Sequence, residues 1–232
     1  PDGIPEISDR WTLHTLYGPH AASDYLTVDY METFFEAEWE VHYNSDRTGV
    51  RLLGPKPQWA RPDGGEAGLH PSNLHDNPYA VGAVDFTGDM PVILGPDGPS
   101  LGGFACPATV ITADLWKLGQ LRPGDRVRFR LVSHPESLEL LTCKEELVSQ
   151  NSKRETTLSI PDRRPRDVEC VLESGRSEED QWIIRQSGDR NLLIEFGEPA
   201  LDLRVRFKVH LFYQLLVGSK ITGIIDLTPG IR

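Results

Sequence analysis

The sequence predicts a mainly β protein, in which a closed or nearly closed β-barrel is followed by a small α+β unit. Short apolar or alternating runs recur through the first half of the chain, separated by turn residues and by only two helical patterns. The 21 glycines and 18 prolines fit a chain with many turns. Beyond residue 180 the pattern changes to a hairpin, one long helix and a strand.

The chain is predicted to open with a strand and a helix. Trp11–Tyr17 is the strand, and Ser23 or Asp24 can cap a helix over Tyr25–Glu38. Apolar residues recur in this helix at steps of three and four, which predicts a face packed into the core: Val28, Met31, Phe35 and Trp39.

The remaining barrel strands follow from short apolar runs. They are expected at Glu40–Tyr43, at Val50–Leu53 and at Ala108–Ile111, while Ala80–Phe86 and Met90–Leu94 are two short apolar runs among turn residues. Thr112 is expected to cap a short helix over Ala113–Leu118. Along Arg126–Leu131 apolar residues alternate with arginines, which predicts a strand with one buried and one solvated face.

Three parts are predicted along the chain: a barrel region over residues 1–141, a charged linker over 142–180 and the start of an α+β unit over 181–232. Charged residues are dense and aromatics absent in Lys144–Asp180, so we expect it to be exposed with little regular structure. In the last part we expect a hairpin from Trp182–Arg185 and Asn191–Phe196. A helix over Leu201–Val217, capped by Asp202 and ended by Gly218, and a strand over Ile221–Leu227 should follow.

Composition excludes several classes of function. The net charge of −11 argues against a nucleic-acid partner, because phosphate binding needs a basic face. No apolar run is long enough for a membrane helix. Three widely spaced cysteines without a CxxC pair fit reduced thiols in a cytosolic protein. Both ends look cut, which predicts an excerpt of a longer polypeptide.

Two series of motifs resemble known families. SDRTGVRL at 45–52, GAVDFTGDMPVIL at 82–94, LGGF at 101–104 and TVITADLWKLGQLRPGDRVRF at 109–129 resemble the later part of allophanate hydrolase subunit 2. IRQSGDRNLLIEFGE at 184–198 and ITGIIDLTPG at 221–230 resemble the start of subunit 1. Subunit 2 followed by subunit 1 in one chain is the order in the carboxyltransferase domain of urea carboxylase, the biotin-dependent part of fungal urea amidolyase. The segment GPDGPSLGGF at 95–104 is similar to the urea carboxylase version.

The resemblance implies cyclophilin-like barrels and transfer of CO2 from carboxybiotin to urea, giving allophanate. The chain has no Met-Lys-Met tripeptide and no phosphate-binding glycine loop with its lysine. The resemblance therefore implies a biotin carrier domain and an ATP-using biotin carboxylase domain elsewhere in the parent protein as partners, and an inactive isolated fragment. Two alternatives stay open: a non-catalytic regulatory or binding module like the sporulation-kinase inhibitor pair, and a 5-oxoprolinase component.

Carboxyl transfer needs polar donors for developing negative charge and a base for the attacking nitrogen. Asp189 at the predicted hairpin tip is the candidate catalytic residue, because it can orient urea or accept its proton. Arg190 and Asn191 beside it are candidate donors to substrate. The alternative for this tip is an Asx-type turn exposed to solvent.

Two further groups of residues are candidates for substrate binding. In the first, an arginine fork from Asp46, Arg47 and Arg51 can hold a carboxylate, although an Asp–Arg clasp that fixes the turn explains them as well. In the second, Gly102 and Gly103 can bring backbone N–H groups close to a substrate oxygen, or can simply permit a tight barrel corner.

No metal site is predicted. His70, His75 and Asp76 lie close together in sequence, but their spacing fits no helical ligand pair and they flank proline and asparagine in a loop. His42 on a strand and His210 on the long helix are expected to be structural.

Overall fold

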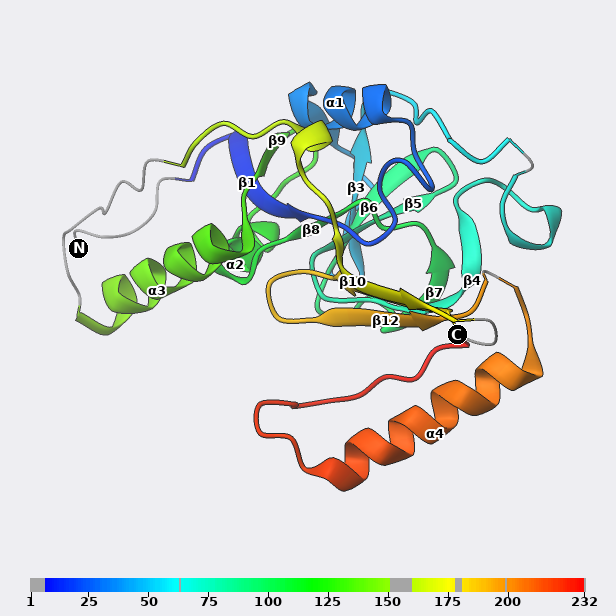
Figure 1. Cartoon of the computed structure of the whole chain (residues 1–232). Coiled ribbons are helices and arrows are strands. Elements are labelled where there is room, and N and C mark those ends of the chain that lie inside the picture. The colour runs from blue at the N-terminus through cyan, green and yellow to red at the C-terminus, as the bar shows by residue number, and fades with distance from the viewer. Residues whose placement is uncertain (1–6, 63, 151–159, 178–180, 199, 232) are drawn as a thin grey trace.

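The computed structural model describes residues 7–62, 64–150, 160–177, 181–198 and 200–231. Its centre is a closed barrel with the strand order β1-β8-β5-β6-β3-β2-β9 (Figure 1). The strands of the barrel are β1 (Arg10–Tyr17), β2 (Trp39–Val41), β3 (Gly49–Leu53), β5 (Ala83–Thr87), β6 (Met90–Leu94), β8 (Ala108–Val110) and β9 (Arg126–Leu131). Neighbouring strands are antiparallel except β1 and β9, which run parallel and close the barrel. The prediction of a mainly β fold with a closed barrel is confirmed.

Aromatic and branched side chains fill the barrel. In β9 the apolar residues are buried and Arg128 and Arg130 are exposed, as the alternation predicts. Helix α1 (Val28–Glu36) packs against the barrel, with the ring of Phe34 stacked on that of Phe129 at a centroid distance of 4.9 Å. The barrel core and its α1 cover therefore form one continuous apolar cluster.

The start and the buried face of α1 differ from the prediction. Thr27 caps the helix, because its hydroxyl accepts a hydrogen bond from the Tyr30 backbone N–H, whereas Ser23 and Asp24 lie before the helix. Tyr30, Met31 and Phe34 form the buried face. Val28 is exposed, because at about 100° per residue it lies to one side of the face formed by these three residues.

A small second sheet lies beside the barrel. It pairs β4 (Asn73–Pro78) with β7 (Leu101–Phe104), and the short 3-10 helix η1 (Glu66–Gly68) precedes it. The Ala105 N–H donates to Ser72 O at 2.8 Å, and the Phe86 N–H donates to Ala105 O at 3.0 Å. These bonds attach the β4–β7 sheet to β5 of the barrel.

The helical turn after β8 covers the predicted residues, but its first part is a 3-10 helix. It consists of the 3-10 helix η2 (Thr112–Asp114) and of α2 (Leu115–Leu118). Thr112 makes no side-chain cap within this turn. Its hydroxyl is used in a contact with the hairpin of the last part of the chain, described below.

The charged linker contains more regular structure than predicted. Helix α3 (His134–Gln150) continues into it, the 3-10 helix η3 (Pro165–Asp167) follows, and β10 (Val171–Arg176) pairs with the next strand. Ser133 and Glu136 form a reciprocal capping box at the start of α3. The expectation of little regular structure in 144–180 was therefore wrong for these described segments, and the division into three parts stays a prediction.

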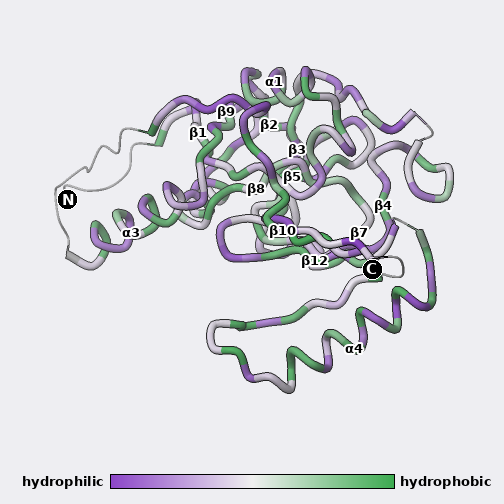
Figure 2. The backbone as a smooth tube through the Cα atoms, in the orientation of Figure 1, coloured by the Kyte–Doolittle hydropathy of each residue, from purple (hydrophilic) through white to green (hydrophobic). Residues whose placement is uncertain are grey.

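The last part forms a three-stranded sheet and a helix. β11 (Gln181–Gln186) lies between β10 and β12 (Leu192–Phe196), and α4 (Leu203–Ser219) follows, capped by Asp202 as predicted. The helix passes through Gly218 and ends at Ser219, and its C-cap Lys220 has a left-handed backbone conformation. The predicted strand over Ile221–Leu227 does not form, because this segment pairs with no strand of the described chain. Figures 1 and 2 show α4 below the main body with apolar residues along its length.

None of the helices in the described residues is both long enough and apolar enough to pass through a membrane.

Candidate functional site

The hairpin tip between β11 and β12 is pressed against the barrel. Asp189 at this tip is buried, and its carboxylate accepts two hydrogen bonds of 2.8 Å, from the backbone N–H and the hydroxyl of Thr112. The backbone carbonyl of Asp189 lies 3.1 Å from His134 Nε2 at the start of α3. One residue of the last part of the chain therefore joins the turn after β8 to the first turn of α3.

The backbone of the tip depends on a glycine. Gly188 has a φ of +86°, and a Cβ added there would lie 3.0 Å from Cγ2 of Thr109. A side chain at position 188 would therefore strain the turn and push it away from the barrel. Arg190 and Asn191 follow directly in the chain and are exposed.

A second polar group lies in the same turn after β8. Asp114 Oδ2 lies 2.8 Å from His14 Nδ1 and accepts the His14 backbone N–H at the same distance, while Lys117 Nζ lies 2.8 Å from Asp114 Oδ1. The pKa of Asp114 is lowered, because these partners outweigh the effect of burial. Sequence reasoning missed this cluster, since its members come from separate elements of the chain.

A buried arginine connects the last sheet to the loop after β1. Arg185 Nε donates to Glu195 at 2.8 Å, and an outer nitrogen donates to Asp24 at 3.1 Å. Burial acts to lower the pKa of Arg185, but Glu195 and Cys170 raise it above its ordinary value. All three nitrogens of the guanidinium are engaged, by Glu195, Cys170 and Asp24.

The predicted turn site at Asp46, Arg47 and Arg51 forms mostly local contacts. Asp46 Oδ1 accepts the backbone N–H groups of Thr48 and Gly49, and these bonds lower its pKa. Arg47 donates two bonds, at 2.6 and 3.1 Å, to Asp97 of the β6–β7 loop.

The third residue of that turn site, Arg51, donates to the backbone carbonyl of Asn44. The predicted Asp–Arg clasp therefore exists, but its carboxylate comes from Asp97. Both hydrogen bonds described for the Arg47 guanidinium go to this carboxylate.

The glycine pair lies on β7 at places of close approach. A Cβ on Gly102 would lie 2.6 Å from the ring of Tyr79, and one on Gly103 would lie 2.7 Å from the carbonyl oxygen of Leu74. Tyr79 in turn shares hydrogen bonds with the backbone of Phe104 through its hydroxyl. Packing alone therefore requires small residues at both positions.

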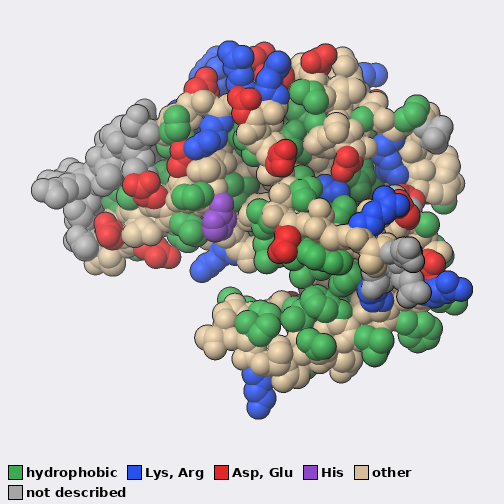
Figure 3. Space-filling model, viewed as in Figure 1, with side chains coloured by type: hydrophobic (Ala, Val, Ile, Leu, Met, Phe, Trp, Pro, Cys, Tyr) green, Lys and Arg blue, Asp and Glu red, His purple; other side chains and the backbone are tan. Residues whose placement is uncertain are grey.

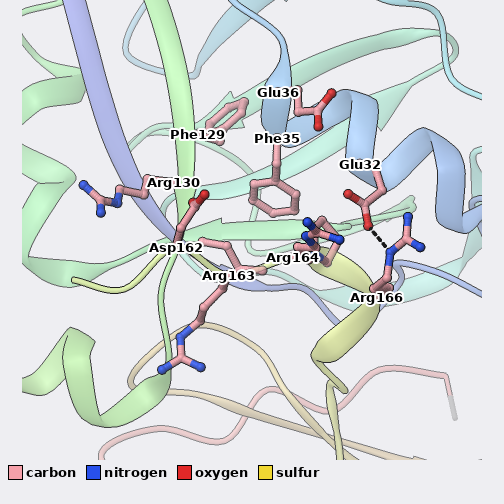
Figure 4. Close-up of a pocket in the computed structure, with 11 residues that line it drawn as sticks. Glu32, Phe35, Glu36, Phe129, Arg130, Asp162, Arg163, Arg164 and Arg166 are labelled. Atoms are coloured by element: carbon pink, nitrogen blue, oxygen red, sulfur yellow. Dashed lines mark hydrogen bonds and ion pairs between the residues drawn. The ribbon is translucent and has the colours of Figure 1, made fainter.

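One hollow lies between α1 and the segment before η3 (Figure 4). It has a volume of about 470 Å³ and both acidic and basic walls. Glu32 pairs with Arg166 at 2.7 Å, and Arg163 points away from the hollow toward Glu136. The run Asp162-Arg163-Arg164-Pro165-Arg166 is its sequence signal, which lies within the predicted linker. The mixed charges suit no ligand of a single sign.

The structure does not join the three predicted groups into one site. Asp189 contacts Thr112 and His134, the arginine turn contacts Asp97, and the glycine pair contacts Tyr79 and Leu74; among the described residues no hydrogen bond or ion pair connects one group to another.

The described part of the chain contains no cluster of three or more possible metal ligands. His70 lies 3.4 Å from Asp89, and His75 lies 3.3 Å from Glu66.

Known proteins match this chain over nearly its whole length. Urea amidolyase of Lachancea kluyveri is 43% identical over 237 residues, which is 99% of this chain and 13% of that protein. The crystal structure of Kluyveromyces lactis urea carboxylase superposes with a TM-score of 0.91 at 40% identity, over 99% of this chain and 21% of that one. A 5-oxoprolinase component of Haemophilus influenzae is 31% identical over 49% of this chain and 34% of its own length.

The chain thus spans only a small part of these longer relatives, and the matches to urea amidolyase and urea carboxylase run through the barrel, the described linker segments and the last sheet. The family described as the carboxyltransferase domain, subdomain A and B, matches residues 1–131. Because this match covers more than half of the sequence, the chain belongs to the carboxyltransferase subdomain A and B family.

Proposed function

We propose that this chain is part of the carboxyltransferase domain of a urea carboxylase, in which a carboxyl group passes from carboxybiotin to a urea nitrogen and yields allophanate. The observation that carries the proposal is the match to K. lactis urea carboxylase, with 40% identity and a TM-score of 0.91 over 99% of the chain. A relative that shared only the barrel would leave the last sheet and α4 unmatched. The match to the 5-oxoprolinase relative covers only 49% of the chain, so a 5-oxoprolinase function is less well supported.

The reaction needs a group that accepts one proton from urea and donors that hold the carboxyl group. When bound, carboxybiotin supplies the activated carboxyl group, and its carrier and the ATP-using carboxylase belong to the parent protein. We assign Arg190 and Asn191 to hold the carboxyl oxygens, since both are exposed beside the tip. We also assign two further groups to substrate binding. The first is the turn with Asp46, Arg47 and Arg51, and the second is the pair of backbone N–H groups of Gly102 and Gly103.

Asp189 is assigned to orient urea or accept its proton. Both of its carboxylate oxygens already accept a hydrogen bond from Thr112, and each retains a further lone pair for a substrate N–H. The two bonds hold the carboxylate in one orientation, which favours catalysis because less reorganisation is needed during reaction. Three free cysteines fit the cytosol as the compartment.

A chimera tests the function directly. In L. kluyveri urea amidolyase, the matched segment is replaced by this chain, and urea-dependent ATP turnover and allophanate formation are measured. Retention of both supports the proposal. A folded chimera that carboxylates biotin but ignores urea, or that responds to 5-oxoproline in place of urea, overturns it. The isolated chain should form no allophanate with ATP and free biotin, and activity there would contradict its role as one part of a larger enzyme.

A further inference from the structure

A buried acidic residue lies between the barrel wall and the β4–β7 sheet. Asp85 on β5 is 2% exposed, while its neighbours Val84 and Phe86 point into the barrel core. Because side chains alternate along a strand, Asp85 points to the outer wall of the barrel. There a separate small apolar cluster forms from Ala83, Leu94 and Cys106, with Tyr79 packed against it.

The carboxyl group of Asp85 has few polar groups around it in this position. Its Oδ1 is buried and has no hydrogen-bond partner within the described structure. The Cys106 thiol is the polar group that acts on it, although this thiol donates to Ala108 O at 3.3 Å, and no lysine or arginine among the described residues forms an ion pair with Asp85. A buried ionised carboxylate without a cation is strongly unfavourable, whereas a neutral carboxylic acid tolerates the same surroundings.

Cys106 and Tyr79 interact with Asp85, and His20 is bonded to Cys106. Cys106 precedes β8, and Tyr79 lies between β4 and β5. His20 follows β1, and its Nδ1 accepts the Cys106 backbone N–H. Burial raises the pKa of Asp85 well above its ordinary value. It does the same for the pKa of the Cys106 thiol and of the Tyr79 hydroxyl, and Asp85 adds to both of these shifts.

We propose that Asp85 remains a neutral acid which, together with Cys106, fastens the β4–β7 sheet to the barrel, so that a rise in pH loosens this sheet. The fastening acts where Tyr79 holds the Phe104 backbone and where Ala105 and Cys106 return to the barrel. When the sheet lifts, Asp85 meets water and releases its proton. Opening therefore becomes easier as pH rises, until the buried acid itself ionises.

The consequence for the site depends on the proposed function, because Gly102 and Gly103 lie on β7 of this sheet. If they bind substrate, Asp85 is a positioning residue that acts through the sheet. The fastening itself does not depend on that function, so it can be tested on the chain alone.

The test measures how fast each cysteine reacts with N-ethylmaleimide between pH 5.5 and 8, by mass spectrometry of the peptides. Cys106 is buried under the sheet, and Cys143 on α3 is partly exposed, so it reports in the same sample how alkylation itself depends on pH. The ratio of the Cys106 rate to the Cys143 rate should rise with pH, by up to about tenfold per unit, because one proton is released on opening.

The matched variant is Asp85→Asn, which retains His20, Tyr79 and both reporter cysteines. Its ratio should stay flat with pH, whatever its absolute level. A wild-type ratio that stays flat, or an Asp85→Asn curve parallel to wild type, overturns the proposal. Thr109→Val changes packing near Cys106 but keeps the acid, and should retain the wild-type slope. If Asp85→Asn fails to fold, the pH dependence of the rate ratio in wild type and in Thr109→Val still tests the proposal. A ratio that does not change with pH in wild type means that no proton is released on opening.

Discussion

Asp189 and Thr112 lie 77 positions apart and are joined by two hydrogen bonds of 2.8 Å each. This contact connects the hairpin of the last sheet to the barrel through one buried carboxylate. We expect Asp189→Ala to lower the free energy of unfolding by about 1–3 kcal/mol, because the Thr112 N–H loses its acceptor. Arg190→Ala at the same tip should change it by no more than about 0.5 kcal/mol. Thermal unfolding of the two variants makes the comparison.

The same substitution separates the catalytic from the structural role of Asp189 in the full-length enzyme. Asp189→Ala should slow carboxyl transfer to urea on the order of a hundredfold, while ATP-dependent carboxylation of biotin stays nearly unchanged. The two half-reactions are measured separately. Equal slowing of both, or a change in thermal stability alone, would assign Asp189 to the turn only.

The glycines of β7 should not tolerate a methyl group. Gly102→Ala and Gly103→Ala place a Cβ 2.6 Å from the Tyr79 ring and 2.7 Å from Leu74 O, so each should destabilise the chain by about 1–3 kcal/mol. Gly119→Ala is the control, because its added Cβ lies 3.7 Å from Trp116 O and its backbone is right-handed helical. Denaturant unfolding of all three should leave Gly119→Ala neutral or slightly stabilised.

The buried pair of Arg185 and Glu195 should show strong coupling. Arg185→Met removes the guanidinium that pairs with Glu195, which is 3% exposed, and should cost about 3–5 kcal/mol. The double variant Arg185→Met/Glu195→Leu should recover most of this loss, since neither charge then remains. The free energies of unfolding of wild type, both single variants and the double variant form a double-mutant cycle that measures this coupling. Additive losses would show that the two side chains act independently.

The start of α3 should be sensitive to acid. Hydrogen bonds from Arg163 and then from Ser133 lower the pKa of Glu136 from 4.5 to about 2. A lowered carboxylate pKa contributes stability above the unfolded value, and this stability is lost as pH falls from about 5 toward 2. Glu136→Gln should flatten this part of the pH–stability curve. Glu139→Gln, an exposed position on the same helix, should follow wild type; equal curves for all three would contradict the assignment.

The outer face of α4 should promote association. Four apolar side chains recur along it at steps of four and are 65–73% exposed: Leu203, Phe207, Leu211 and Leu215. Figure 3 shows hydrophobic side chains over α4, below the main body. Purified chain should therefore self-associate with rising concentration. Phe207→Gln/Leu211→Gln should reduce this in sedimentation velocity, whereas Gln214→Ala should not.

Local patterns determined much of the fold. Alternation along Arg126–Leu131 and the turn at Ser187–Arg190 predicted their strands correctly, because period-two burial and turn chemistry are properties of neighbouring residues. Helix α3 was missed because its apolar periodicity is weak, although the capping-box pattern Ser133-His-Pro-Glu136 marked its start. The strand predicted at Ile221–Leu227 has β-forming residues, but no described strand lies beside it to complete a sheet.

By itself, the sequence determined the barrel class, the family motifs and the residue types suited to carboxyl transfer. The tertiary structure decided which of these side chains are already engaged. Arg47 pairs with Asp97 and not with Asp46, Asp189 is held by Thr112, and Asp85 is buried against Cys106 without a cation. The physical reason is that hydrogen bonds and desolvation depend on groups that meet only when distant segments pack together, and no spacing along the chain encodes those distances.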